Sequence, residues 1–305
     1  MKNYLQLLIE KFPIRRSKDQ KEQFRAFIKN EVNNYDVVIE NLENKHNNII
    51  IGNVAKAKVV FTAHYDTPAA SLYPNLMLPK NFVLSLLYGI FFPILMALIS
   101  LALAYGLYSL MRFPYETILL LYIVIYFGMF YLLTRCFPNK NNSNDNTSGV
   151  SVILTLIEKN YQDVAFILFD NEEKGLLGSK AYKKAHKEMM SKKVLINFDC
   201  VGNGKHIIIT SKKEARTTEL YTVLTNCFTS DLEYSVEFVP MEKSRSNTDH
   251  KNYELGIGIL ACIKTKKGFC YTPRIHTKKD IKVDFNNILF ITNNLSKLIE
   301  NYKTR

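Results

Sequence analysis

Residues 58–67 read KVVFTAHYDT, a stretch in which a strand pattern is followed by polar side chains. Its first six residues form a short apolar run that predicts a buried strand at 58–63. His64 and Asp66 follow directly after the strand. Functional side chains of open α/β sheets gather just past the carboxyl ends of the strands. The stretch therefore predicts a sheet and, at one of its edges, part of a site.

Further short apolar runs predict the other buried strands, at 48–53, 164–169, 194–198, 206–210 and 256–263. Helical patterns lie before and between these runs, at 3–11, 18–32, 148–159, 175–190, 214–227 and 283–302. Strands that alternate with helices indicate an α/β fold, with a mixed, mostly parallel sheet and helices on both faces.

The composition changes abruptly at Asn81. Residues 81–111 are 31 residues without an Asp, Glu, Lys, Arg or His, and residues 117–134 are 18 more. A helix of about 20 apolar residues crosses a hydrocarbon core of about 30 Å, so both stretches predict transmembrane helices. A buried pair of core helices is the alternative, but stretches that are apolar on every side are rare in globular cores.

Two spans joined by the short polar break 112–116 form a transmembrane helical hairpin, which returns to the side from which it started. We predict this insertion at 75–137, with residues 1–74 and 138–305 forming one discontinuous domain. Near the spans, three Lys or Arg residues lie on the domain side and one lies in the turn. Because Lys and Arg that flank spans favour the cytoplasmic side, this predicts a protein of the cell membrane with its domain in the cytoplasm.

The cysteines and the amino-terminal residues agree with that location. The five cysteines are scattered without a CxxC pair, which argues against a disulfide scaffold and fits a reducing compartment. The first residues lack the pattern of a signal peptide. The net charge of +12 suggests either attraction to nucleic acid or an anionic membrane, or a lysine-rich exterior. The lysines are spread along the chain without a nucleic-acid-binding signature, so we expect no nucleic-acid partner.

Residues of the types that bind metals stand at the ends of several predicted strands. They are His64, Asp66, Asp145, Asp170, Glu172, Glu173, Asp199 and, in a late loop, His276. Each has an ordinary alternative: Asp145 could cap the helix at 148–159, and Glu172–Glu173 could be a solvated acidic turn. Several carboxylates gathered at one sheet edge repel one another unless a cation neutralises them. Two histidines among them favour zinc over calcium or magnesium.

Five short motifs then occur in the order found in a known family. They are His64-Tyr65-Asp66-Thr67, Asp145-Asn146-Thr147-Ser148-Gly149, Asn171-Glu172-Glu173-Lys174-Gly175-Leu176-Leu177-Gly178-Ser179, Asn197-Phe198-Asp199 and His276-Thr277. With them the sequence resembles the di-zinc aminopeptidases, a metallopeptidase superfamily of bacterial leucyl aminopeptidases, glutamate carboxypeptidases and glutaminyl cyclases. The predicted hairpin lies between the first two motifs, where the family usually has a short loop.

The resemblance implies two zinc ions held by five residues: His64, Asp145, Glu173, Asp199 and His276. Asp145 would bridge both ions, with His64 and Asp199 completing one site and Glu173 and His276 the other. Glu172 would be the general base, and Asp66 would orient the ring of His64. His250 competes with His276 for the last ligand position. The motif Thr248-Asp249-His250 resembles one near family active sites, although Thr248 departs from the usual serine.

The expected function is that of a membrane-anchored aminopeptidase, which removes N-terminal residues from peptides by means of a metal-activated water. Its expected partners are peptide substrates and, at the hairpin, membrane lipid. Three alternatives stay open: a carboxypeptidase with Arg245 or Arg274 holding the substrate carboxylate, another amidohydrolase of the same superfamily, and an inactive membrane scaffold. A glutaminyl cyclase would use one zinc ion, and the full set of five ligands argues against it. The remaining histidines, His46, His186 and His206, stand beside lysines or in polar contexts and are expected at the surface.

Overall fold

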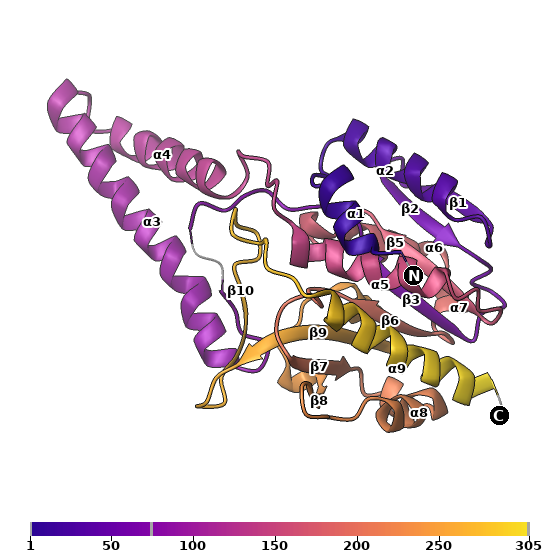
Figure 1. Ribbon diagram of the computed structural model, residues 1–305. Coiled ribbons are helices and arrows are strands. Elements are labelled where there is room, and N and C mark those ends of the chain that lie inside the picture. The colour runs from indigo at the N-terminus through magenta and orange to yellow at the C-terminus, as the bar shows by residue number, and fades with distance from the viewer. Residues whose placement is uncertain (1, 74–75, 304–305) are drawn as a thin grey trace.

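The computed structural model describes residues 2–73 and 76–303. Figure 1 shows a twisted sheet with helices on both sides and two long helices that project away from it. The strands are β1 (Val37–Leu42), β2 (His46–Ile51), β3 (Val59–His64), β4 (Leu76–Met77), β5 (Val164–Phe169), β6 (Val194–Phe198), β7 (His206–Ser211), β8 (Ser235–Pro240), β9 (Gly256–Lys264) and β10 (Cys270–Pro273). Their order is β1-β2-β5-β3-β6-β9-β10-β4, and β7 joins β9 and β8 beside this path.

The centre of the sheet is parallel. In the order β5-β3-β6-β9, each strand runs parallel to its neighbour, and all six residues of β3 and of β5 are buried. A strand covered on both faces consists of consecutive apolar residues, which is why the sequence predicts these strands well. The register pairs His64 with Phe169, so the carboxyl ends of β3 and β5 lie side by side.

The predicted α/β class with a mixed sheet is confirmed, but the sheet is not mostly parallel. Of the nine strand pairings among the described residues, four are parallel and five are antiparallel. The antiparallel pairings flank the parallel centre, where β1, β2, β4, β7 and β10 are attached. Two of the antiparallel pairs, β1–β2 and β9–β10, are hairpins joined by short turns and need no crossover helix. The other three pair strands that lie far apart in the chain, so the alternation of strands and helices in the sequence does not reveal them.

Helices cover both faces of the sheet, as predicted. They are α1 (Tyr4–Lys11), α2 (Lys18–Glu31), α5 (Gly149–Ile157), α6 (Leu177–Ala185), α7 (Lys187–Met190), α8 (Glu219–Cys227) and α9 (Phe285–Lys303). Phe61 belongs to the larger core cluster, which includes residues of α1, α2, α5, α8 and α9. Its neighbour Val60 points to the opposite face and packs with Tyr182 and Met190 of α6 and α7. This alternation follows from the period of two along a strand.

Helices α3 (Phe82–Met111) and α4 (Thr117–Thr134) coincide closely with the two predicted spans. They pack against each other and project from the sheet as a hairpin (Figure 1). Both are long and apolar enough to cross a membrane. Only 11% of the most apolar 18-residue stretch of α3 is buried, and 0% of that of α4. Core helices of a soluble protein would be covered, so these two helices leave a large apolar surface for another environment.

Two of the histidines that were expected at the surface are buried. His46 at the start of β2 is 6% exposed, and His206 at the start of β7 is 3% exposed. The prediction was wrong because it relied on neighbours along the chain. In a strand the next residue points to the opposite face, so a lysine beside a histidine says little about the environment of the histidine. His186, between α6 and α7, is partly exposed and pairs with Glu40.

Candidate metal centre

The predicted metal-binding residues come from five separate segments that end at the same edge of the sheet. His64 is the last residue of β3, and Asp199 follows β6 directly. Glu172 and Glu173 begin a short turn of 3-10 helix just after β5. Asp145 precedes α5, and His276 lies three residues beyond the end of β10. The parallel centre of the sheet thus brings the carboxyl ends of β3, β5 and β6 together, as expected for an open α/β sheet.

Asp145 lies between the two histidines. Its Oδ1 is 3.3 Å from Nε2 of His64, and its Oδ2 is 2.9 Å from Nε2 of His276. Nε2 of His64 is also 3.8 Å from Oδ1 of Asp199, and Nε2 of His276 is 3.4 Å from Oε2 of Glu173. The five residues therefore form two groups of three that share Asp145, and the ligand atoms of each group lie within 4.8 Å of one another.

The donor atoms of this cluster fit metal ions. Three buried polar atoms of the cluster have no hydrogen-bond partner among the described residues: Nε2 of His64, Oδ1 of Asp199 and Oε1 of Glu173. Buried polar atoms are normally paired, so unpaired atoms that converge on one place indicate a missing partner. A mixture of imidazole nitrogens and carboxylate oxygens suits zinc. The residues present therefore fit the zinc ions that the sequence suggests.

The electrostatics of the cluster also favour a cation. Burial is the main cause that raises the pKa of Glu173; with the added charge of Asp145 and against the opposing effect of the two histidines, the pKa reaches about 8. Burial also acts to raise the pKa of Asp145, but His276 and His64 outweigh it and hold that pKa well below its ordinary value. The carboxylates thus compete for the two available positive partners, and bound cations would relieve that competition.

Asp66 contacts both the ring and the acidic turn. Its carboxylate accepts hydrogen bonds from the backbone N–H groups of Glu172, at 2.9 Å, and Glu173, at 3.3 Å. Nδ1 of His64 is 3.1 Å from the carbonyl oxygen of Asp66 and 3.6 Å from its carboxylate. The nearer partner of the ring is therefore the backbone carbonyl, and the carboxylate mainly holds the turn that carries both glutamates.

Glu172 lies beside the two groups of ligands that share Asp145 and belongs to neither. One of its oxygens is within 4.8 Å of ligand atoms of His64 and Glu173. Burial raises the pKa of Glu172 well above its ordinary value; His64 opposes this, while Glu173 and Asp249 add to it. A carboxylate with a raised pKa can hold a proton near neutral pH, which is the property that a general base and acid needs.

The structure separates the two candidates for the last ligand position. His276 faces Asp145 and Glu173, as described above. His250 is fully buried between two threonines, with Nδ1 2.7 Å from Oγ1 of Thr248 and Nε2 3.0 Å from Oγ1 of Thr210. Both of its ring nitrogens are therefore engaged away from the cluster. Burial lowers the pKa of His250 to about 3, so its ring is neutral in the folded protein at neutral pH.

Two residues that support the cluster were not predicted to do so. Both carboxylate oxygens of Asp280 accept backbone hydrogen bonds, from Asn144 N at 3.1 Å and Asp145 N at 3.0 Å. Arg15 is fully buried and donates to the carbonyl oxygen of Tyr65 and to Oγ1 of Thr147. Asp280 could have been suspected, because it follows His276 by four residues. Arg15 carries no local signal, since its partners lie 50 and 132 positions away.

A cleft of about 1180 Å³ opens over the cluster. The cluster contributes Asp145, Glu172, Glu173, Asp199 and His276 to its lining. Six basic residues also line it: Arg135, Lys174, Lys212, Lys213, Arg245 and Lys251. Leu76, Leu78 and Ser85 extend the lining to the base of α3. The cleft thus connects the metal-type residues with the start of the hairpin, and Arg245, one of the two predicted carboxylate-binding arginines, lies in it.

Comparisons with known proteins agree with the fold. The profile of peptidase family M28 matches residues 137–290, which are 154 of the 305 residues. Two solved structures from Legionella pneumophila, the aminopeptidase LapA and LapB, each superpose with a TM-score of 0.57 at 13% identity, over 97% of this chain and 69% of theirs. A protein described as PhTET1-12s, a dodecamer, gives a TM-score of 0.51 at 12% identity, over 98% of this chain and 99% of its own.

At such low identities the solved structures show only that the fold is shared. The match to the family profile is what assigns the chain to a family. No curated protein sequence matches the chain.

Proposed function

This chain belongs to peptidase family M28 and is a metallopeptidase, and we propose that it acts as a membrane-anchored aminopeptidase with two zinc ions. It would remove N-terminal residues from peptides. The observation that carries the proposal is the position of Asp145, whose two oxygens face His64 and His276 separately. A single carboxylate between two groups of ligands suits two neighbouring ions, because each of its oxygens can bind one of them.

The five converging residues would divide between the ions. His64 and Asp199 would hold one ion, Glu173 and His276 the other, and Asp145 both. Bound zinc ions supply a water of lowered pKa and polarise the scissile carbonyl. Glu172, which the Asp66 carboxylate holds through its backbone N–H, would take the proton from the attacking water and pass it to the leaving amine. The two adjacent glutamates would thus have different tasks.

The experiment that tests this function combines metal analysis with substrate screening. The full-length protein, purified in detergent, is analysed for bound metal and is assayed with a panel of amino-acid p-nitroanilides. We expect zinc at the site and hydrolysis of unblocked substrates, and no hydrolysis after removal of the metal by a chelator. Turnover that persists in the metal-free protein would contradict the proposal. Absence of turnover on every substrate in the fully zinc-loaded protein would instead support the inactive scaffold.

A carboxypeptidase is the second candidate, because the cleft carries six basic side chains around the cluster. Such residues would attract the free carboxylate of a substrate C-terminus. Matched peptides separate the two functions: one with an acetylated N-terminus and one with an amidated C-terminus. An aminopeptidase cleaves only the amidated peptide, whereas a carboxypeptidase cleaves only the acetylated one.

We also propose that α3 and α4 anchor the enzyme in a membrane. Both helices are apolar and largely uncovered by the rest of the chain. The cleft lining includes Ser85 of α3 and Leu76–Leu78 just before it. Substrates would therefore reach the site close to the lipid surface. Retention of the protein in the membrane fraction after washing with high salt and alkaline carbonate tests the anchor, since a peripheral protein is released by that treatment.

A further inference from the structure

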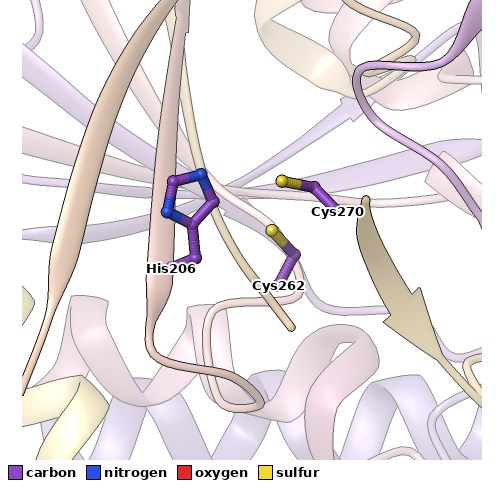
Figure 2. Close-up of side chains that lie close together, drawn as sticks. All are labelled: His206, Cys262 and Cys270. Atoms are coloured by element: carbon purple, nitrogen blue, oxygen red, sulfur yellow. The ribbon is translucent and has the colours of Figure 1, made fainter. Parts of the chain in front are cut away.

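Three potential metal ligands gather outside the proposed active site. His206 begins β7, Cys262 lies on β9 opposite His206, and Cys270 begins β10 on the far side of β9. One ligand atom from each lies within 4.8 Å of the other two. Their exposed fractions are 3%, 0% and 4%. Figure 2 shows the imidazole edge and both sulfur atoms directed towards the same space.

We propose that His206, Cys262 and Cys270 bind a structural zinc ion, separate from the peptidase centre. Two thiolates and an imidazole are ligands that zinc prefers in closed structural sites. Zn–S bonds of about 2.3 Å and Zn–N bonds of about 2.0 Å place tetrahedral ligand atoms roughly 3.5–3.8 Å apart. From separations of no more than 4.8 Å, the three donor atoms would thus have to approach one another by at most about 1.3 Å.

Glu237 of β8 would be the fourth ligand; it lies beside His206, and its carboxylate would have to turn towards the two sulfur atoms. Its Oε2 is 3.1 Å from Nε2 of His206, a separation normal for two atoms that share one metal ion. The other ring nitrogen, Nδ1, is 2.6 Å from Oγ of Ser235. A metal-binding histidine usually donates its remaining N–H to such a partner, which directs the lone pair of Nε2 towards the metal. In a metal-free site the ring would instead donate Nε2–H to Glu237.

The charges around the site are consistent with a divalent ion. Two thiolates and the Glu237 carboxylate carry three negative charges, one more than the ion neutralises. Lys80 forms an ion pair with Glu237 and supplies the remaining positive charge. Buried charge needs such compensation to be stable. The side chains of Glu237 and Lys80 are about one-third exposed, so the site also has a route to solvent.

The location gives the ion a structural task. β10 pairs with β9 on one side and, on the other, with β4, the short strand that leads into α3. His276 follows the end of β10 by three residues. An ion held by Cys262 and Cys270 would fasten β10 to β9, and would thereby steady both the entry to the hairpin and the loop that carries His276.

Cobalt substitution tests the site without relying on enzyme activity. The five proposed ligands of the peptidase centre include no thiol, although Cys200 lies beside them in the cleft. A thiolate-to-cobalt charge-transfer band in the near ultraviolet therefore reports the second site when it depends on Cys262 and Cys270. The full-length protein, purified anaerobically in detergent and loaded with Co²⁺, should show this band. Cys262→Ser and Cys270→Ser should abolish it and should each bind one metal ion fewer per chain. Cys227→Ser, which alters a buried thiol of α8, is the matched control and should keep the band.

Further outcomes decide the proposal if the serine variants fold poorly. Asp145→Asn disrupts the peptidase centre alone and should keep the thiolate band, so its loss there would overturn the proposal. Absence of the band from the cobalt-loaded wild-type protein would also overturn it, as would a Cys262–Cys270 disulfide in the anaerobic preparation. Glu237→Gln should shift the band and leave it present, because the carboxylate completes the coordination without supplying sulfur.

Discussion

Asp66 accepts a hydrogen bond from the backbone N–H of Glu172 at 2.9 Å, and this bond joins the ends of two adjacent strands. Asp66 follows β3, Glu172 follows β5, and the two strands are parallel neighbours. The loop after β3 therefore supplies a proposed ligand, His64, and also holds the turn that carries the proposed general base. The arrangement of the site depends on this link as much as on the ligands themselves.

Asp66→Asn should weaken the metal site without abolishing it. The amide retains only one acceptor oxygen, so one of the two backbone N–H groups of the acidic turn loses its partner. Residues that orient ligands typically contribute about 10–100-fold in metal affinity. We expect a loss in that range, measured by competition with a chromogenic chelator. An unchanged affinity, in a variant with the wild-type melting temperature, would show that the turn holds its position without Asp66.

Asp145→Asn should have a larger effect on metal binding than Asp66→Asn. Asp145 faces both histidines and belongs to both groups of ligands, so its loss should affect both ions. We expect the purified variant to retain clearly less metal than Asp66→Asn under the same dialysis. Elemental analysis of both variants beside the wild-type protein makes the comparison. Retention of the full metal content of the wild-type protein would refute a bridging role.

Glu172→Gln should separate binding from chemistry. The amide has nearly the same shape but cannot accept the proton of the attacking water. General base catalysis typically contributes about 10²–10⁴-fold, so kcat should fall by that factor. The metal content should remain that of the wild-type protein, because five other residues are assigned as ligands. Normal turnover in a folded, metal-loaded variant would remove Glu172 from this role.

The sequence predicts the centre of the fold better than its edges. The strands at 164–169 and 194–198 begin and end where the apolar runs do, because they are covered on both faces. β1 reads VVIENL and β8 reads SVEFVP, and both were missed. These strands are only partly buried, so polar residues interrupt their apolar pattern. β4 and β10 are too short to give a pattern at all.

The two sites also differ in how well the sequence predicts their residues. The proposed active-site residues lie in short motifs directly after strands, where position in the sequence implies position in space. His206, Cys262 and Cys270 belong to no motif, and only the antiparallel register of β7 and β9 places His206 opposite Cys262. That register cannot be read from a sequence in which the pairing partners are more than 50 positions apart. Arg15 was missed as a support for the same reason, since Tyr65 and Thr147, to which it donates, belong to distant segments.

His250 should make the stability of the fold depend on pH. Burial lowers its pKa from 6.5 to about 3 in the folded protein. Between these two pH values the ring is protonated in the unfolded chain and neutral in the folded one. Its contribution is fully present above pH 6.5 and is lost as the pH falls from there towards 3. In His250→Asn this loss is absent. We therefore expect the melting temperature of metal-free wild-type protein to exceed that of His250→Asn at neutral pH, and the difference to shrink on acidification. A constant difference would contradict the burial of a neutral ring.

We predict that the peptidase domain lies on the cytoplasmic side of the membrane. A hairpin puts both of its ends on one side, so residues 1–74 and 138–305 must share that side. Lys80, Arg135 and Lys140 flank the spans there, against Arg112 alone in the turn, and flanking Lys and Arg favour the cytoplasm. Cysteine labelling in intact cells tests this topology. Cys136 is the only native cysteine that is not buried, so Cys136→Ser is a sufficient background.

In that background, Tyr115→Cys lies in the exposed turn between the spans, and Lys297→Cys lies on the exposed side of α9. A membrane-impermeant maleimide should label the first variant in intact cells and should label the second only after permeabilisation. The background alone is the control and should stay unlabelled in intact cells, because its remaining thiols are buried. The opposite pattern would place the domain outside the cell. The site would then work on external peptides, and the thiols of Cys262 and Cys270 would face an oxidising environment in which a disulfide competes with metal binding.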